Sequence, residues 1–515
     1  MVQHLADLNE DQREAALHDG HCLITACPGS GKTRTLAAKA VHILASTSAA
    51  TVCAVTYTRE SALEIRERIV RVLIQTIGDE AARAARARLL TGTFHSLCFM
   101  QPAPMVSKEG YGAAILSQMR TGGTALARTT IATEGDRRGY LIRAMELARL
   151  SDMTLEGGLR VLEAVKARLV PPDKNDRTPG DKLFHAYQDI LNRNGKIDFQ
   201  DIVLRAVRGL KEGSVLPFPA DYLLVDEFQD TDELQYEWMR EHARAGTRIT
   251  AVGDDDQSIY AFRSAMGYAG MEKFAQEWDA LHVVLGVNYR CHAEILDSSD
   301  RLIRNNIGRI TKNLIAAKGH GGSSCYMVFE DAEAEGIAVT NCAAAWRAKQ
   351  KLELAVIART NRRLDHVEAS LTTSGIPFVR TGGGSILDKE EVSVFADIIS
   401  LVCETGFAGL DHVLSWAGVT EEDLRVLHKD LGKSLIAAKK AELERLDIGA
   451  RSVDLWWEFG KKLKSWREAA ERGKEFFVIA SIRQWMESCA DNDAQVRMIG
   501  LAATVFGGIK SQLPR

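Results

Sequence analysis

The sequence predicts an α/β protein with parallel sheets, in which two long helical segments interrupt the alternation of strands and helices. Three observations support this fold class. Short apolar stretches of strand length stand next to amphipathic stretches of helical length. A glycine-containing loop joins one apolar stretch directly to an alanine-rich helix, in "HCLITACPGSGKTRTLAAKAVHILAS". The segments from about 98 to 205 and from about 385 to 505 contain many helix formers and few strand signals.

The N-terminal half alternates between strands and helices. "TVCAVTYT" (51–58) predicts a strand and leads into the amphipathic helix "RESALEIRERIVRVL", and "LLTGTF" (89–94) predicts another strand. Further on, "DYLLVDE" (221–227) and "RITAVGD" (248–254) predict two more strands, with the amphipathic "DELQYEWMREHARAG" between them. This alternation predicts a parallel sheet with ligands at the carboxyl ends of its strands.

A second alternating pattern appears after "VNYR". "LAVIART" (354–360) predicts a strand, "NRRLDHVEASLTTSG" predicts a helix that Gly375 ends, and "IPFVRTGGG" predicts a strand and a turn. From about 385 to 505 the chain is again nearly all helical in pattern. We therefore expect a second α/β region followed by a second helical segment.

Length and composition limit the kind of protein. The 515 residues are too many for one compact core and predict about two to four domains. A hydrophobic content of 46% and a charged content of 26% are those of an ordinary soluble globular protein. No apolar run approaches the roughly 18 residues that cross a bilayer, and the N-terminus lacks an apolar signal core. We expect a cytoplasmic protein with no membrane segment.

Cysteine spacing and net charge exclude little more. Nine cysteines are scattered along the chain, and no two have C-x-x-C spacing, which argues against a zinc or iron–sulfur cluster and fits a reducing cytosol. The net charge of −4 gives no overall nucleic-acid signature. A basic track on one face remains open, because nucleic-acid binding depends on the charge of that face rather than on the total.

"ACPGSGKT", which begins at Ala26, fits the phosphate-loop pattern G-x-x-x-x-G-K-[ST] except that Ala26 replaces the first glycine. Gly29 and Gly31 let backbone N–H groups turn toward phosphate oxygens, and the helix that follows adds its dipole. Lys32 is expected to contact the β- and γ-phosphates, and the hydroxyl of Thr33 to ligate Mg²⁺. The alternative is a glycine turn with an incidental lysine, and the position between a strand and a helix argues against it.

"VDEFQDTDE" places several acids after an apolar strand. Asp226 is expected to supply a second contact to Mg²⁺, and Glu227 to orient and deprotonate the attacking water. Alone, such a strand end is more often a solvated turn, but the phosphate loop upstream favours the metal site. Gln229 and Asp230 are expected to link the nucleotide site to a neighbouring lobe. Asp232 and Glu233 are expected to start a helix, where negative charge suits the dipole.

"AVGDDDQSIYAFRSA" repeats the arrangement of an apolar strand followed by acids. Gln257 is a candidate sensor of the γ-phosphate. Phe262 is a candidate for stacking on a base, which contributes about 1–3 kcal/mol per base, and its alternative role is that of an ordinary core aromatic. In "VNYRC", Arg290 is a candidate for stabilising charge on the γ-phosphate, as an arginine finger does.

These motifs, in this order, resemble those of the UvrD/Rep/PcrA-type superfamily 1 DNA helicases over nearly the whole chain. "LNEDQREAAL" is similar to the family's adenine-reading Q motif, "ACPGSGKTR" to its Walker A motif, "VDEFQDT" to its Walker B motif and "NYR" to its motif IV. The resemblance implies that Gln12 contacts adenine, that Tyr289 packs near it, and that Arg290 reaches the γ-phosphate. The nucleotide contacts that we expect are Gln12, Ala26, Gly29, Ser30, Gly31, Lys32, Thr33, Arg34 and Tyr289.

Three further motifs imply contacts with DNA. "AVTYTRESALEIRERI" is similar to motif Ia, although Arg59 replaces the usual Asn, and "GTFHSL" is similar to motif Ib. "VGDDDQSIYAFRSA" is similar to motif III, in which many members have Trp at the position of Phe262. The DNA contacts that the resemblance implies are Tyr57, Thr58, Arg59, Thr93, Phe94, His95, Tyr260, Phe262 and Arg263.

The resemblance also implies a domain plan of two RecA-like P-loop NTPase lobes, each with a helical insertion. "DFQDIVLRA" looks like the end of the first insertion, and "GGGSILDKEEV" resembles the start of the second. The expected division is a first lobe at 1–97 and 206–279, its insertion at 98–205, a partial second lobe at 280–384 and a second insertion at 385–515. The implied activity is an ATP- and Mg²⁺-dependent helicase or translocase that moves 3′ to 5′ on single-stranded DNA or at single/double-strand junctions.

Two motifs of the family are absent from the sequence. Neither "AKGLE", typical of motif V, nor "YVALTRA", typical of motif VI, is present. The second lobe is therefore expected to be incomplete and to lack an arginine that stabilises the transition state by several kcal/mol.

Three explanations of these absent motifs stay open: a fragment or truncated gene, which we favour; a chain whose protein partner completes the lobe; and an ATP- and DNA-binding module with little unwinding activity. A helicase–nuclease is the weakest reading, because no nuclease-like cluster of carboxylates and lysine stands outside the ATPase motifs. The cellular pathway, whether DNA repair, replication restart, plasmid transfer or phage defence, stays undetermined.

Overall fold

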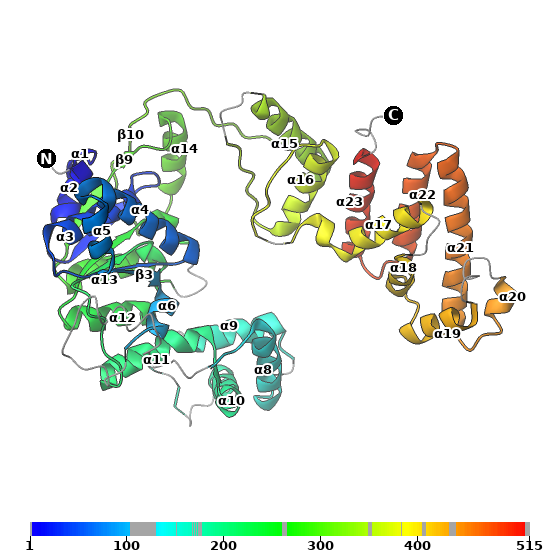
Figure 1. Cartoon of the computed structure of the whole chain (residues 1–515), viewed down its shortest axis with the longest axis horizontal. Helices are drawn as coiled ribbons and strands as arrows, with labels where there is room; N and C mark the ends of the chain where they lie inside the picture. Colours follow the sequence, from blue (N-terminus) through cyan, green and yellow to red (C-terminus); the bar gives the residue numbers. More distant parts are fainter. Residues whose placement is uncertain are drawn as a thin grey trace. The chain divides into compact units, whose positions relative to one another are not determined.

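A computed structural model places the chain in two compact units, Met1–Cys325 and Tyr326–Arg515 (Figure 1). No helix among the described residues is both long and apolar enough to cross a membrane. The residues that the structure describes are 3–102, 130–150, 152–166, 168, 170, 172–173, 178–259, 265–348, 353–382, 384–403, 408–431 and 439–509.

The first unit contains a six-stranded sheet in the order β3-β2-β6-β7-β1-β8, and every neighbouring pair is parallel. This confirms the parallel sheet that the alternating pattern predicts. β1, β2 and β6 are buried along their whole length, which explains why they read as continuous apolar runs. The strands are β1 (Cys22–Ala26), β2 (Val52–Thr56), β3 (Leu89–Thr93), β6 (Tyr222–Val225), β7 (Arg248–Gly253) and β8 (Leu281–Leu285).

Helices cover both faces of this sheet (Figure 1). In β1, Cys22 and Ile24 pack into one hydrophobic cluster and Leu23 packs into the other, because successive side chains of a strand point to opposite faces. The first cluster includes residues of α2 (Glu10–Leu17), α3 (Lys32–Ser46), α4 (Arg59–Ile77) and α5 (Asp79–Arg86). The second includes residues of α6 (Phe94–Phe99), α11 (Phe199–Glu212), α12 (Glu233–Arg244) and α13 (Gly267–Glu277). A short helix, α1 (Gln3–Ala6), precedes α2.

The segment between β3 and α11 forms a helical insertion with its own hydrophobic cluster. Its described helices agree with the predicted helical character of 98–205, although two short strands, β4 and β5, also pair there. Its elements are β4 (Thr130–Ile131), α8 (Glu134–Leu147), α9 (Leu155–Lys166), α10 (Pro179–Arg193) and β5 (Lys196–Ile197).

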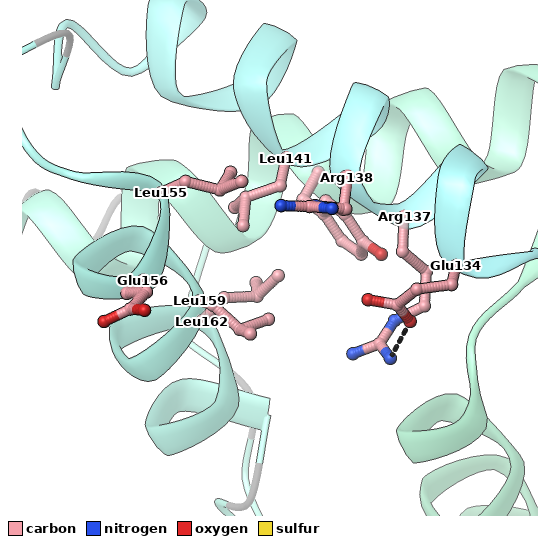
Figure 2. A pocket seen from close by; sticks show the side chains of 9 residues that line it. Glu134, Arg137, Arg138, Leu141, Leu155, Glu156, Leu159 and Leu162 are labelled. Atoms are coloured by element: carbon pink, nitrogen blue, oxygen red, sulfur yellow. Dashed lines mark hydrogen bonds and ion pairs between the residues drawn. The ribbon is translucent and has the colours of Figure 1, made fainter. Parts of the chain in front are cut away.

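Figure 2 shows a pocket of about 200 Å³ in this insertion, where an ion pair of 3.1 Å joins Glu134 and Arg137. Its apolar lining comes from α8 and α9, at Leu141, Leu155, Leu159 and Leu162.

The chain from β8 to Cys325 stays with the first unit. β8 pairs with β1 and buries Val283 and Leu285 in the same hydrophobic cluster as α3, so this strand is an edge of the first sheet rather than a part of a second one. The predicted second lobe, in contrast, starts at 280. The elements that follow β8 are β9 (Val287–Asn288), α14 (Ala293–Ile303) and β10 (Ile315–Ala316), and two 3₁₀ turns, η1 (Phe228–Asp230) and η2 (Asp255–Gln257), follow β6 and β7.

The second unit is helical, as the pattern after about 385 predicts. Trp456, Phe459, Trp466 and Trp485 are buried in one cluster. Its helices are α15 (Ala332–Arg347), α16 (Asn361–Thr373), η4 (Ile386–Asp388), α17 (Glu390–Cys403), α18 (Leu410–Trp416), α19 (Glu421–Leu431), α20 (Lys440–Leu443), α21 (Ala450–Glu471), α22 (Glu475–Cys489) and α23 (Asp493–Ile509).

Two strands that the sequence predicts are not formed in the second unit. The described residues of 354–360 and 376–384 carry no strand, although the predicted helix between them is present as α16. Ile357 is 91% exposed and Val379 is 89% exposed. A strand requires a neighbouring backbone to pair with, and no described segment of this unit supplies one. The prediction of these two strands is therefore wrong for this structure.

Candidate nucleotide site

The phosphate loop lies between β1 and α3, where the sequence predicts it. Gly29 and Gly31 adopt φ angles of +72° and +87°, in the left-handed region that favours glycine. A Cβ atom at Gly29 would lie 2.5 Å from the Cβ of Arg290, and one at Gly31 would lie 2.9 Å from the Nε2 of Gln12. The turn of the backbone therefore favours glycine at both positions, and the close approach of Arg290 adds a second requirement at Gly29.

The N-terminal helix α2 is attached to this loop through Gln12. Asn9 caps the helix: its side chain accepts a hydrogen bond from the backbone N–H of Gln12, and the Oε1 of Gln12 accepts one from the N–H of Asn9. The Nε2 of Gln12 donates to the carbonyl of Ser30 over 2.8 Å. Gln12 is 1% exposed, and its side-chain oxygen and nitrogen each take part in one of these hydrogen bonds. Arg34, a further predicted contact, is exposed and pairs with Asp7.

The acids after β6 meet the phosphate loop. The Nζ of Lys32 lies 2.7 Å from the Oε2 of Glu227, and the Nε2 of Gln229 donates to the same oxygen over 2.9 Å. Burial alone would raise the pKa of Glu227, but the charge of Lys32 and these two hydrogen bonds lower it. Glu227 has a φ of +52°, a conformation that a non-glycine residue seldom adopts. The structure thus brings together the lysine and the carboxylate that the sequence predicts as catalytic partners.

Asp226 is buried directly behind this pair. Its Oδ1 accepts a hydrogen bond from the N–H of Glu227 over 3.0 Å. Burial and the neighbouring Glu227 raise the pKa of Asp226 to about 6, although Lys32 opposes this shift. Among the described residues, no lysine or arginine forms an ion pair with Asp226. A buried carboxylate of this kind, with the hydroxyl of Thr33 at the start of α3, offers the oxygen ligands that Mg²⁺ prefers.

Gln229 connects the carboxylate of Glu227 with the acids that follow β7. Its Oε1 accepts a hydrogen bond from the N–H of Asp254 over 2.9 Å. The Oδ2 of Asp254 in turn accepts one from the Nε2 of Gln257 over 2.5 Å. A continuous set of hydrogen bonds therefore runs from Glu227 to Gln257. Tyr260, Phe262 and Arg263 lie outside the described residues.

The residues around β9 lie over the phosphate loop. The backbone N–H of Tyr289 donates to the carbonyl of Gly29 over 3.0 Å, and the Nδ2 of Asn9 donates to the hydroxyl of Tyr289 over 3.1 Å. Asn288 donates from its side chain to the carbonyl of Pro28. These contacts place the exposed side chains of Tyr289 and Arg290 next to the loop. Sequence reasoning missed Asn9 and Asn288, although both stand inside motifs that it identified.

The predicted DNA contacts that belong to the ends of β2 and β3 lie close together at one end of the sheet. β2 and β3 are parallel neighbours, with Thr56 paired to Thr93, so the residues that follow these two strands share the carboxyl edge. Thr58 and Arg59 are exposed at the start of α4, where the Thr58 side chain accepts a hydrogen bond from the N–H of Ser61. Tyr57, which precedes them, is half-buried.

The motif at the end of β3, which contains Thr93, Phe94 and His95, is largely inaccessible to solvent. Phe94 is 2% exposed, and its ring packs edge-on against Trp238 at 5.8 Å, so its side chain is not available to contact DNA. Thr93 caps α6 by accepting a hydrogen bond from the N–H of Ser96. His95 lies half-buried, and burial lowers its pKa, which favours the neutral ring at neutral pH. Of these three residues, Thr93 and His95 remain as candidates for DNA contact.

Comparison with protein families gives two matches. Residues 8–277 match the UvrD/REP helicase N-terminal domain, and residues 283–407 match the UvrD-like helicase C-terminal domain. The matches therefore extend over both compact units.

Curated relatives to which the chain is similar are DNA helicases by name. The chain is 28% identical to DNA helicase II of Haemophilus influenzae, over 75% of this chain and 53% of that protein. It is 29% identical to DNA helicase II of Escherichia coli, over 78% of this chain and 55% of that protein. It is 27% identical to the ATP-dependent DNA helicase PcrA of Bacillus subtilis, over 78% of this chain and 54% of that protein. The chain thus spans about half the length of these relatives.

Proposed function

The chain belongs to the UvrD/REP helicase family, and from this premise we propose that it is an ATP-dependent DNA helicase or translocase. It couples ATP hydrolysis to movement along single-stranded DNA, in the 3′ to 5′ direction that its resemblance to the family implies. The observation that carries this proposal is the contact of 2.7 Å between Lys32 and Glu227, at the mouth of a glycine loop. A phosphate-binding lysine and a carboxylate positioned for water attack are the two groups that such hydrolysis requires.

In the proposed reaction, the phosphates of ATP displace Glu227 as the partner of Lys32. The ammonium of Lys32 then binds the β- and γ-phosphates, and the carboxylate of Glu227 is released to orient and deprotonate water. Thr33 and Asp226 would hold Mg²⁺, which supplies charge neutralisation at the phosphates. The exchange of partners at Lys32 makes the general base available only when nucleotide is bound.

Residues around the loop complete the proposed site. Gln12 hydrogen-bonds the adenine, Tyr289 packs near it, and the backbone groups from Ala26 to Gly31 surround the phosphates. Arg290 is exposed beside the phosphate loop, where its Cβ lies in the space that a side chain at Gly29 would take, and its guanidinium would stabilise charge on the γ-phosphate. Gln257 senses the γ-phosphate and is tied to the general base through Asp254 and Gln229.

Single-stranded DNA is the proposed substrate. Tyr57, Thr58, Arg59, Thr93 and His95 follow two neighbouring parallel strands and lie on the same edge of the sheet. A cationic side chain and polar groups on one edge suit the backbone of a single strand. The proposed aromatic and basic contacts at Tyr260, Phe262 and Arg263 belong to the same interaction.

An ATP- and DNA-binding module with little unwinding activity is the second candidate. It is favoured by the described residues of 354–360 and 376–384, on either side of α16, which form no strand. This candidate shares the nucleotide site and differs in turnover. A protein partner that completes the second lobe would convert the second candidate into the first.

Nucleotide binding by Lys32→Ala tests the assignment of the site. We expect the affinity for a fluorescent ATP analogue to fall by about tenfold or more, because the lysine supplies charge-assisted hydrogen bonds to the phosphates. Lys182→Met, which changes an exposed lysine on α10, is the control and should bind normally. An unchanged affinity of Lys32→Ala would show that nucleotide does not bind at this loop.

A further inference from the structure

Lys312 is buried among three carboxylates that follow β7. Its side chain is 1% exposed, and its Nζ lies 2.7 Å from Asp254, 2.6 Å from Asp255 and 2.7 Å from Asp256. Oxygens of these three acids lie close enough together to hold a metal ion. In this structure the ammonium of Lys312 is the cation that they surround. Burial would lower the pKa of Lys312, but the three carboxylates outweigh it and raise the pKa, so the side chain is charged at neutral pH.

Two further contacts attach the same segment to the acidic turn. Arg309 binds Asp256 through two nitrogens, over 2.8 and 2.7 Å. The backbone N–H of Ile310 donates to the Oδ2 of Asp255 over 2.7 Å. Side-chain and backbone hydrogen bonds from a segment more than fifty residues further along the chain therefore stabilise the turn Asp255–Gln257.

The segment that contains Lys312 also supports the strand before Arg290. It continues into β10, in which Ile315 pairs with Val287 and Ala316 pairs with Asn288. A Cβ atom at Gly286 would lie 2.2 Å from the carbonyl oxygen of Asn313, so the two backbones meet closely. The segment 309–316 thus contacts two parts of the site. Lys312 binds Asp254, which accepts a hydrogen bond from Gln257, and β10 pairs with β9, which directly precedes Tyr289 and Arg290.

We propose that Lys312 is a positioning residue for recognition of the γ-phosphate. It acts through Asp254: the Oδ1 of Asp254 accepts from Lys312, and the Oδ2 accepts from the Nε2 of Gln257. By fixing this carboxylate, Lys312 sets the orientation of the Gln257 amide and its position relative to Arg290. The inference rests on the proposed function, because it assigns Lys312 to the nucleotide site described above.

The test is a mutant cycle that keeps the net charge of the cluster constant. Lys312→Met combined with Asp255→Asn removes one positive and one negative charge together, which avoids leaving three unpaired carboxylates in the interior. Three variants are compared with the unmodified chain: this double variant, the single variant Gln257→Ala, and the triple variant that combines all three changes. Lys440→Met with Asp454→Asn removes an exposed ion pair of 2.8 Å in the second unit and is the control for the change of charges.

The readout is the ratio of the affinities for a non-hydrolysable ATP analogue and for ADP, which does not depend on turnover. Thermal unfolding midpoints first establish that each variant is folded. We expect the ratio to fall by about tenfold in the Lys312 pair, as for loss of a hydrogen bond to a charged group. The triple variant should lose no more than Gln257→Ala alone, since both changes act through the same amide.

The proposal would be overturned if the losses in this affinity ratio multiplied in the triple variant, as they do for independent changes. An unchanged affinity ratio in the Lys312 pair would also overturn it. So would equal affinities of the unmodified chain for the analogue and for ADP. Failure of the proposed function gives a different result. In that case the analogue is preferred and the cycle is non-additive, yet ATP is not hydrolysed. If the chain hydrolyses ATP but the effects of the Lys312 pair and of Gln257→Ala are additive, the positioning role of Lys312 is rejected and the proposed function is retained.

Discussion

Lys32 and Glu227, which are 195 residues apart in the sequence, form an ion pair of 2.7 Å at the carboxyl edge of the central sheet. The lysine begins α3 and the glutamate follows β6, so the pair joins the phosphate loop to the acidic strand end. β1 and β6 are separated in the sheet by β7 alone. The parallel arrangement of these strands is therefore what brings the two groups together.

The first prediction concerns Glu227. Glu227→Gln removes the proposed general base and leaves a side chain of the same size. We expect ATP hydrolysis to fall by about 100-fold or more, because a positioned base contributes about that factor. The affinity for an ATP analogue should stay the same or increase, since Lys32 no longer pairs with a carboxylate. Single-turnover hydrolysis and analogue binding measure the two effects separately, and a rate equal to that of the unmodified chain would exclude Glu227 as the base.

The second prediction uses the raised pKa of Asp226. Its shift from 3.8 to about 6 means that the folded chain holds a proton that the unfolded chain releases between these pH values. Stability therefore decreases as the pH rises from about 4 to 6 and then stays lower. Asp226→Asn, whose amide oxygen can still accept from Glu227, should stabilise the chain at pH 7.5 by up to about 3 kcal/mol.

Urea unfolding of this variant at several pH values checks the prediction. The advantage of Asp226→Asn should shrink below pH 6 and disappear near pH 4, where both forms of the residue are neutral. Excess Mg²⁺ with ADP should stabilise the unmodified chain more than the variant. A gain in stability that is independent of pH would contradict the assigned cause.

The third prediction separates two requirements at Gly29. Gly29→Ala introduces a Cβ that would lie 2.5 Å from the Cβ of Arg290, at a φ of +72°. Gly213 has a φ of +74° and no heavy atom within 4 Å of such a Cβ, so Gly213→Ala is the matched control for backbone strain alone. Gly213→Ala should lose about 1 kcal/mol of stability from backbone strain, and Gly29→Ala should lose more, because its Cβ also meets that of Arg290. Only Gly29→Ala should also lose affinity for nucleotide. Equal nucleotide affinities in the two variants would contradict the close approach of Arg290 to position 29.

The fourth prediction concerns DNA. Arg59 is exposed at the edge where the proposed DNA contacts gather. Arg59→Ala should weaken binding to oligo(dT) and reduce the slope of log affinity against log salt by about 0.7, as for loss of one phosphate contact to a single strand. Arg83→Ala, in which an exposed arginine paired to Asp79 is removed, is the control. An identical slope for Arg59→Ala and the unmodified chain would remove Arg59 from the interface.

Much of the nucleotide site could be predicted because its parts are local. The phosphate loop, the acids after β6 and the residues after β8 each occupy a few consecutive positions, and a parallel sheet places all such strand ends on one edge. The start of a helix near Asp232 was equally local: Asp232 caps α12 and accepts from the N–H of Gln235. These predictions required only the order of strands and helices and the chemistry of the side chains.

The parts that could not be predicted depend on distant partners. Lys312 reads as one surface lysine among many, and only the fold reveals that it is buried with three acids from another segment. Phe94 stands in a motif that implies a DNA contact, but it packs against Trp238, which is remote in the sequence. Residues 354–358 form the continuous apolar run that is typical of a buried strand, yet such a run does not specify a pairing partner.

ATP hydrolysis by the unmodified chain, measured with Mg²⁺ in the presence and absence of oligo(dT), distinguishes a DNA-coupled motor from a chain that only binds its ligands. A motor that couples nucleotide to single-stranded DNA must hydrolyse ATP faster when DNA is bound. We expect a rate that rises with oligo(dT) concentration and saturates, and that falls by about 100-fold or more in Glu227→Gln. Equal rates with and without DNA, or an unchanged rate in Glu227→Gln, would contradict this expectation.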